Sequence, residues 1–293
     1  MKVSEGYMPY LGNKTYYRTV GECQEGKKPL ILIHGGPGSA HNYFELLDDY
    51  REDGRMIVMY DQIGCGNSAV ANRPDLWHAR TWVDELIALR NHLELDEVHL
   101  LGQSWGGMLV IAYLCDDQPK GVSSAIFSST LPSALLWKQE QRRMIKFMTE
   151  QEQAIIQETE VTGAYDNPAY LAVNAKYMAL HAADAISDES PEPLRRPKGS
   201  GAEAYLTAWG PNEYSPTGTL KDFNYVDRLS QIEIPVLLTS GTDDLSTPLI
   251  NKTMVDRLPK ARWELFAHSR HMPFLDEKER YKRILLDWLN QHD

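Results

Sequence analysis

The chain has 293 residues, of which 42% are hydrophobic and 24% are charged, and its formal net charge is −11. This composition is ordinary for a globular enzyme, whereas the acidic balance argues against nucleic acid and anionic membrane surfaces as partners. No apolar stretch approaches the roughly 20 residues that a membrane span needs, and residues 1–9 contain no apolar signal core. We therefore expect a cytoplasmic protein without a membrane span, with an association at the cell envelope left open.

The cysteines and histidines give no sign of a disulfide framework or a metal site. No C-x-x-C pair occurs, and an odd number of cysteines fits free thiols in a reducing compartment. The three are Cys23, Cys65 and Cys115. The histidines include no H-E-x-x-H motif, and their close pairs lack carboxylate or thiolate partners at an obvious ligand spacing. We expect neither a metal ion nor a cofactor.

The first half of the chain alternates strand and helix patterns. Short apolar runs at 30–34, 56–61 and 98–101 predict buried strands, and the pattern over 81–93 predicts a helix between two of them. Such alternation is typical of a parallel sheet covered by helices on both faces. In these sheets the loops at the carboxyl ends of the strands form the functional site.

Glycine-rich loops follow the first two predicted strands. The sequence H-G-G-P-G at 34–38 combines glycines, which let the backbone approach a bound carbonyl group, with Pro37, which limits the freedom of the loop. The sequence D-Q-I-G-C-G-N-S at 61–68 follows the second strand, and we interpret it as scaffold near the site. Cys65 in this loop is either close enough for thiol reagents to hinder activity or a buried, inert thiol.

The third strand runs directly into G-Q-S-W-G at 102–106. The pattern G-x-S-x-G is typical of a nucleophile elbow, in which the flanking glycines make room for a strained, exposed serine between a strand and a helix. Such a pentapeptide also occurs in plain strand-to-helix turns, but its position at a strand end favours a functional serine. We predict that Ser104 is a nucleophile.

The middle of the chain predicts a second domain. After a strand that ends near residue 129, the sheet pattern returns only about a hundred residues later, and most of the intervening sequence is helical and charged. We expect a helical cap at 131–227, inserted into a catalytic domain made of 1–130 and 228–293. Within the cap, 139–158 predicts one solvated helix and 187–201 predicts a mobile loop. A cap over the elbow would exclude water and limit the size of the substrate.

Two loops downstream of Ser104 offer the partners that a serine nucleophile needs. The predicted strand at 235–240 opens into G-T-D-D, where either Asp243 or Asp244 could turn inward. The next strand, at 263–266, opens into A-H-S-R-H. We favour His271 as the base because it stands just before the helical stretch 277–290, and we expect His268 at the surface.

The roles of these residues follow from the movement of charge. His271 would take the proton of Ser104 as the hydroxyl attacks a carbonyl group, and the aspartate would fix the tautomer and stabilise the imidazolium. The oxyanion needs preorganised N–H donors, usually the residue after the nucleophile and one from the loop after the early strand. We predict the N–H groups of Trp105 and Gly36.

These motifs together closely resemble proline iminopeptidases, also called prolyl aminopeptidases, with the lactic-acid-bacterial members as the nearest match. The resemblance rests on H-G-G-P-G, D-Q-I-G-C-G-N-S, G-Q-S-W-G-G at 102–107, W-G-P-N-E at 209–213 and G-T-D-D at 241–244. It implies the α/β-hydrolase fold, a mostly parallel central sheet flanked by helices, with an inserted helical cap domain. It also implies release of N-terminal proline from short peptides without metal or cofactor, with Asp244 as the acid and His271 as the base.

The same resemblance suggests how a free amino terminus is recognised. A buried carboxylate senses a cationic amine, because a blocked amine leaves that carboxylate unpaired. By the family's motif, Glu213 is this carboxylate. Some relatives carry a second acid directly after the catalytic aspartate, where this chain has Leu245. A second amine contact therefore stays open, as do the oligomeric state and the choice among proline, hydroxyproline, alanine and leucine.

Two other functions use the same features. An amino-acid amidase, an esterase or an acyltransferase would keep the same serine, base, acid and oxyanion donors. A non-catalytic binding protein of this fold would lack a member of the triad, whereas Ser104, Asp244 and His271 are all present. Glu213 discriminates an aminopeptidase from an esterase, because only the former needs an amine-binding carboxylate.

Overall fold

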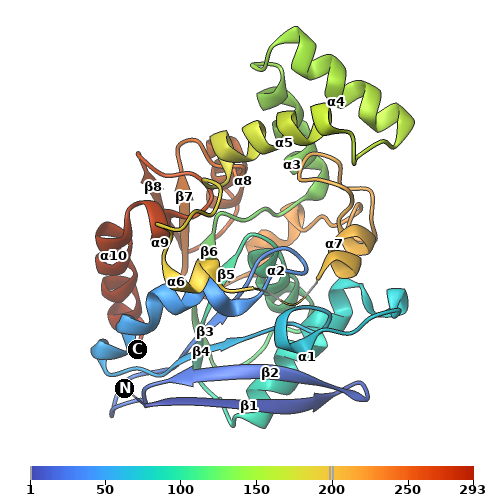
Figure 1. Ribbon diagram of the computed structural model, residues 1–293. Coiled ribbons are helices and arrows are strands. Elements are labelled where there is room, and N and C mark those ends of the chain that lie inside the picture. The colour runs from blue at the N-terminus through green and yellow to red at the C-terminus, as the bar shows by residue number, and fades with distance from the viewer. Residues whose placement is uncertain (1, 198, 200) are drawn as a thin grey trace.

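The computed structural model describes residues 2–197, 199 and 201–293. Eight strands of this part form one sheet in the order β1-β2-β4-β3-β5-β6-β7-β8. In Figure 1, β1 and β2 run along the bottom of the molecule, and β7 and β8 lie at its upper left. The strands are β1 (Val3–Tyr10), β2 (Asn13–Val20), β3 (Leu30–Ile33), β4 (Ile57–Tyr60), β5 (Val98–Gln103), β6 (Val122–Ser128), β7 (Val236–Gly241) and β8 (Ala261–Phe266).

The sheet is parallel from β4 to β8, as the alternation of strand and helix predicts. β3 pairs in parallel with both β4 and β5, and β5, β6, β7 and β8 continue in the same direction. β1 and β2 form an antiparallel hairpin that joins β4 at one edge. The sequence did not predict this hairpin, because β1 is largely exposed and contains Gly6 and Pro9 where a buried strand would have a run of apolar residues.

Helices cover both faces of the sheet. Ile31 and Ile33 of β3 pack with α1 (Ala79–His92) and α2 (Trp105–Asp116). Their neighbours Leu30 and Leu32 pack on the other face, with the 3₁₀ segment η1 (His41–Asp53) and with α10 (Lys278–Gln291). This alternation buries β3 on both sides, which explains why its sequence is a continuous apolar run.

The remaining short elements lie mainly in loops. They are η2 (Gly66–Ser68), η3 (Pro74–Leu76), η4 (Val226–Gln231), α8 (Pro248–Val255) and α9 (Pro273–Asp276). The predicted helices over 81–93 and 277–290 correspond to α1 and α10, so both predictions are confirmed.

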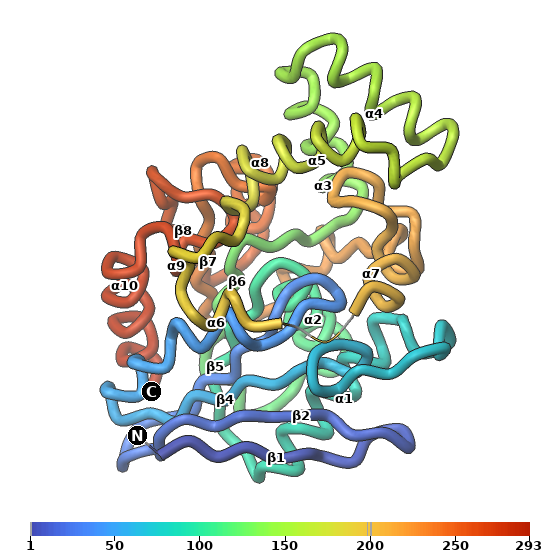
Figure 2. Tube along the Cα trace, viewed as in Figure 1, coloured from blue at the N-terminus to red at the C-terminus, as the bar shows by residue number. Residues whose placement is uncertain are grey.

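In the described part of the segment between β6 and β7, where the sequence predicts a cap, there are five α-helices. They are α3 (Ala134–Ile145), α4 (Glu150–Thr162), α5 (Pro168–His181), α6 (Glu192–Arg195) and α7 (Ala202–Ala208). α4 and α5 project above the rest of the molecule, and the chain then descends through α6 toward the blue N-terminal segments (Figures 1 and 2). The exact boundaries of a cap domain at 131–227 stay a prediction.

Two predictions inside this region need correction. The expected single helix over 139–158 is two helices, because Thr149 starts α4 with a capping box in which it exchanges hydrogen bonds with Glu152. The segment 187–201 was expected to be a loop, yet it contains the single turn α6, and Arg196 forms a bidentate ion pair with Glu45 of η1. Lys198 and Ser200 of this segment lie outside the described residues.

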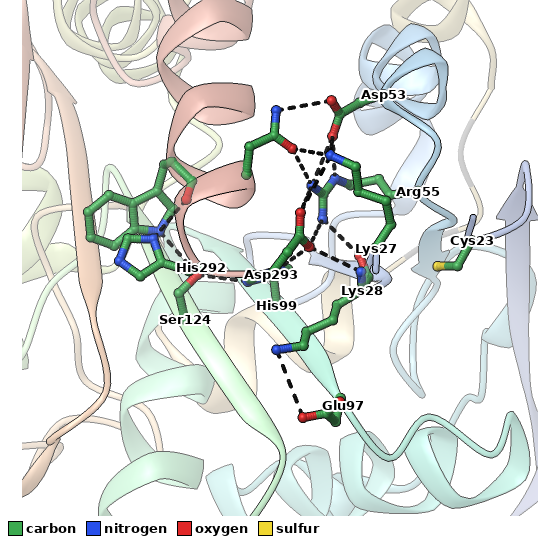
Figure 3. Close-up of polar contacts among 12 residues, drawn as sticks. Cys23, Lys27, Lys28, Asp53, Arg55, Glu97, His99, Ser124, His292 and Asp293 are labelled. Atoms are coloured by element: carbon green, nitrogen blue, oxygen red, sulfur yellow. Dashed lines mark hydrogen bonds and ion pairs between the residues drawn. The ribbon is translucent and has the colours of Figure 1, made fainter. Parts of the chain in front are cut away.

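A buried ionic cluster lies at the amino ends of the strands, opposite the loops in which the site is expected. Arg55 precedes β4 and is fully buried, and its guanidinium donates to the carboxylates of Asp53 and Asp293 and to the carbonyl of Lys28. Asp293 also lies 3.3 Å from His99 at the start of β5 (Figure 3). Burial and the charge of Arg55 lower the pKa of His99 to about 4, so this imidazole is neutral.

Candidate active site

Ser104 occupies a strained turn between β5 and α2. Its φ of 55° and ψ of −122° are unusual for a residue with a side chain and cost about 1–3 kcal/mol. The flanking positions need glycine for steric reasons, because a Cβ atom at residue 102 would lie 2.3 Å from the carbonyl oxygen of Gly106. A Cβ atom at residue 106 would lie 2.0 Å from the carbonyl oxygen of Ile33. The sequence thus forms a nucleophile elbow, and Ser104 is 9% exposed.

Asp244 and His271 meet across the ends of two neighbouring strands. Nδ1 of His271 lies 2.6 Å from Oδ1 of Asp244, which is 1% exposed. The same carboxylate accepts backbone N–H groups of Gly241 and Ser246, at 3.1 and 2.8 Å. These bonds hold the carboxylate in position, so that Oδ1 can accept from Nδ1–H of the imidazole and leave Nε2 free to accept a proton.

The structure thereby separates the alternatives that the sequence left open. The side chain of Asp243 is exposed, and its backbone carbonyl lies 3.0 Å from Nδ1 of His181. His268 is also exposed, and its backbone N–H donates to Glu277. Only the pair Asp244 and His271 combines burial with a mutual hydrogen bond in the described part of these two loops.

The predicted oxyanion donors lie on either side of Ser104. Gly36, Trp105 and Ser104 line one small hollow. Gly36 has a φ of +117°, which favours glycine, and a Cβ atom there would lie 2.6 Å from the N of Gly38. Trp105 is the first residue of α2, where helix geometry leaves N–H groups without partners. Within the described residues, no hydrogen bond uses the N–H of either residue.

Two glutamine side chains connect these loops, and the sequence analysis missed both. Gln62 accepts from the indole N–H of Trp105 at 2.7 Å and donates to the carbonyl of His34 at 2.8 Å. Gln103 accepts from the hydroxyl of Tyr43 at 2.9 Å and donates to the carbonyl of His271 at 3.2 Å. Both residues stand beside motif positions at strand ends, which is the signal that could have identified them.

The end of α5, between β6 and β7, contacts both the loop that carries Asp244 and the loop that carries His271. The carbonyl of Ala182 accepts from the N–H of His271 at 3.2 Å, and the carbonyl of His181 accepts from the N–H of Leu245 at 3.1 Å. Arg270 adds a bond to the carbonyl of Ala179 at 2.7 Å. The last carbonyl groups of a helix lack partners within the helix, so these bonds satisfy them and fix the two loops together.

Glu213 lies in the same site although it is 109 positions after Ser104 in the chain. One carboxylate oxygen accepts from the hydroxyl of Tyr205 at 2.8 Å, and its backbone carbonyl accepts from the indole of Trp137 at 2.7 Å. Burial raises the pKa of Glu213, an effect that the Tyr205 bond and the nearby His271 oppose. A cationic group beside this carboxylate would offset the cost of burying it.

Two hollows meet at these residues. A cavity of about 540 Å³ includes Ser104, His271, Glu213 and Leu245 in its lining. A much smaller hollow shares Gly36, Ser104 and Glu213 with it. The other walls of the smaller hollow are bulky apolar side chains, those of Trp105, Met108, Leu131, Trp137 and Trp209.

Other potential reactive groups lie apart from this chemistry. Cys65 is buried, its thiol donates to the carbonyl of Gln62, and burial raises its pKa well above the usual range, as expected for an inert thiol. Among the described residues, no three His, Cys, Asp or Glu side chains gather closely enough to hold a metal ion. In the same part of the chain, no helix is both long and apolar enough to cross a membrane.

Comparisons with known proteins agree with this geometry. The profile of the alpha/beta hydrolase fold family matches residues 28–278, which confirms the predicted fold. A proline iminopeptidase of Clostridium botulinum is 56% identical over 293 residues, covering 100% of both chains. One of Levilactobacillus brevis is 56% identical over 294 residues, covering 100% of this chain and 98% of that protein, which confirms the similarity to lactic-acid-bacterial members.

A solved structure extends the similarity to three dimensions. The crystal structure of a proline iminopeptidase from Mycobacterium smegmatis matches with a TM-score of 0.87 and 30% identity, covering 99% of this chain and 98% of that one. The similarity therefore spans the sheet and the helices between β6 and β7 alike. This chain belongs to the proline iminopeptidase family of α/β hydrolases.

Proposed function

We propose that the protein is a proline iminopeptidase, a serine exopeptidase that releases N-terminal proline from short peptides through an acyl-enzyme on Ser104. The observation that carries this proposal is the position of Glu213, a buried carboxylate that lines both hollows beside Ser104. An esterase needs no such group. The names of relatives at 56% identity over the full chain support the same function.

His271 and Asp244 activate the serine. Asp244 holds the imidazole through Nδ1 at 2.6 Å, so that Nε2 accepts the proton of Ser104 when its oxygen attacks the carbonyl carbon of the first residue. The imidazolium then donates that proton to the leaving amine as the peptide bond breaks. A water molecule, deprotonated by His271 in turn, hydrolyses the ester on Ser104 and frees proline.

The N–H groups of Gly36 and Trp105 stabilise the negative oxygen of each tetrahedral intermediate. Both flank Ser104 in the smaller hollow, and neither has a partner within the described chain. Donors that need no reorganisation at the moment of reaction lower the barrier most effectively. Gln62 bonds both the indole of Trp105 and the carbonyl of His34, and so holds together the two loops that supply the donors.

Glu213 binds the secondary ammonium group of the N-terminal proline. The cation gives the buried carboxylate a charge partner, whereas an acetylated amine would leave the carboxylate unpaired. The aromatic side chains of Trp137 and Trp209 stand beside Glu213, and aromatic faces suit a pyrrolidine ring. With Leu245 next to Asp244, Glu213 is our sole proposed acid for the amine.

The helices between β6 and β7 act, in this proposal, as a cap domain at 131–227 over a catalytic domain made of 1–130 and 228–293. Glu213 and Trp209 come from the cap, and Ser104 comes from the catalytic domain, so the substrate is held between the two. This arrangement fits an exopeptidase, because little room remains beyond the first residue on the side of the amine. A cytoplasmic location stays a prediction from the sequence.

Hydrolysis of proline β-naphthylamide tests the proposal, beside its N-acetylated form and a p-nitrophenyl ester. We expect rapid release of naphthylamine from the free-amine substrate alone, and its loss in Ser104→Ala. Turnover of the ester without release from the proline substrate would instead identify an esterase built on this scaffold.

A further inference from the structure

The larger cavity extends beyond the groups that the reaction uses. It meets the smaller hollow at Gly36, Ser104 and Glu213, and it continues past His271. Its volume of about 540 Å³ exceeds what a water molecule needs by far. This space therefore has room for a further part of the substrate.

The direction of the peptide follows from the proposed function, on which this inference rests. If Glu213 binds the amine, the prolyl ring lies at the end of the larger cavity that Glu213 and Gly36 line, and the carbonyl carbon lies at Ser104. The leaving nitrogen must then lie on the side of His271, which protonates it. The second residue of the substrate consequently enters the larger cavity.

Apolar side chains form much of the lining of this cavity. The apolar residues of the lining include the alanines at 182, 183 and 185 and Tyr43, Met178, Ile186, Leu194, Met272 and Leu275. Ile186 is 59% exposed, so a substrate side chain packed against it would remove apolar surface from water. Leu194 lies on the single turn α6, which the pair Arg196 and Glu45 ties to η1.

Besides Glu213 and His271, the titratable side chains in the lining are those of Asp184, Arg270 and Asp276, which pair with one another. Both terminal nitrogens of Arg270 bind Asp184, at 2.8 and 2.9 Å, and its backbone N–H donates to Asp276 at 2.9 Å. Asp276 also lies 3.6 Å from the guanidinium. Two carboxylates thus surround one cation, and the group as a whole carries negative charge. This wall repels a carboxylate of the substrate.

We propose that the larger cavity is a subsite for an apolar side chain at the second position of the substrate, and that its acidic wall selects against an acidic second residue. Ile186 and Leu194 determine this specificity by covering the side chain. The subsite affects which peptides lose their proline, and it leaves the catalytic groups unchanged.

Three dipeptide amides test the subsite: prolyl-leucine, prolyl-glycine and prolyl-aspartate amide, each without a charged carboxyl terminus. We expect kcat/KM for the leucine compound to exceed that for the glycine compound by about tenfold, since burying one aliphatic side chain gives a discrimination of this order. The aspartate compound should fall below the glycine compound.

Two variants locate the effect. Ile186→Ala and Leu194→Ala should each reduce the preference for leucine over glycine about threefold, while kcat/KM for the glycine compound changes less than twofold. Leu135→Ala is the matched control, since Leu135 is 61% exposed on α3 and lies outside the lining of both hollows. It should leave the preference unchanged.

The outcomes separate this inference from the proposed function. Cleavage of the glycine compound with no gain for leucine, or a gain that both variants retain, overturns the subsite and leaves the iminopeptidase in place. Failure to cleave any of the three, with Ser104-dependent hydrolysis of a p-nitrophenyl ester, overturns both.

Discussion

The two ends of the parallel strands each bury charged groups, but these groups differ in how they are paired. At the amino ends, Arg55 binds Asp53, Asp293, Asn290 and the carbonyl of Lys28 (Figure 3). At the carboxyl ends, Asp244 is equally well bound, yet the carboxylate of Glu213 faces two hollows.

This difference separates a structural cluster from a binding site. Buried charges are costly unless they are paired, so a fold without ligands pairs them internally, as Arg55 and its partners do. Glu213 has one hydrogen bond to Tyr205 and no cation beside it among the described side chains. A site that binds a cation keeps such a position free for the ligand.

The largest effect is expected at Asp244. Asp244→Asn removes the charge that stabilises the imidazolium and disturbs the tautomer of His271, so kcat for the proline substrate should fall about 10³–10⁴-fold. Steady-state kinetics measure the loss, and circular dichroism checks the fold. Asp243→Asn is the matched control, because its exposed side chain should change kcat less than twofold. Equal losses in both variants contradict the assignment of the acid.

At the amino ends of the strands, Arg55→Ala should lower stability and leave catalysis unchanged. It leaves Asp53 and Asp293 without their buried partner, so the free energy of unfolding should fall by about 3–5 kcal/mol. Denaturant titration measures this change, while kcat of the folded fraction stays within twofold. Arg262→Ala removes a half-exposed ion pair on β8 and should cost less than about 1 kcal/mol. If fully folded Arg55→Ala lost kcat, the amino ends of the strands would also contribute to catalysis, which would contradict this prediction.

Glu213→Gln keeps the shape of the side chain and removes its charge. We expect kcat/KM for proline β-naphthylamide to fall about 100-fold, because a buried charged hydrogen bond to the substrate is lost. Hydrolysis of a p-nitrophenyl ester should change less than about threefold. Glu189→Gln, at an exposed position of the cap, is the control. Similar losses on amine and ester substrates would assign Glu213 a structural role.

The smallest effect is the dependence of stability on pH that arises from His99. Its pKa is about 4 in the folded chain and 6.5 ordinarily, so between these values the unfolded chain binds the proton more readily. This contribution to stability is complete above pH 6.5 and is lost as the pH falls toward 4. Unfolding free energies of the wild type and His99→Asn at pH 5 and pH 7 measure it. The wild type should lose more stability, and an equal loss would contradict a neutral, buried His99.

The sequence predicted the parts of the site that local chemistry determines. Strand ends, glycine spacing and chain order make Ser104, the two loops and His271 the candidates, because each depends on a few neighbouring residues, and the structure brings these segments to one place. The choice between Asp243 and Asp244 depends on which side chain turns inward, which adjacent positions do not reveal. The sequence did not predict the roles of Gln62 and Gln103, because each depends on a hydrogen bond to a distant loop or helix, to Trp105 and to His271 respectively.

The fold, like the site, was predicted where local sequence patterns determine the structure. Continuous apolar runs predicted β3 to β7 well, because strands buried on both faces have that pattern. β8 lies at one sheet edge and is only partly buried, and the sequence predicted it from residues 263–266. β1 lies at the other edge and is mostly exposed, so the hairpin that it forms with β2 has no comparable signal. The break between α3 and α4 depends on a capping box at Thr149, which a search for helical periodicity alone passes over.

In our proposal, a serine nucleophile and an amine-binding carboxylate share one site. Covalent labelling with a fluorophosphonate tests both, with the modified residue mapped by mass spectrometry in the presence of prolinamide or N-acetylprolinamide. We predict one label per chain, on Ser104, with labelling slowed by prolinamide and unaffected by its acetylated form. Labelling at another residue, or equal protection by both compounds, would contradict the account.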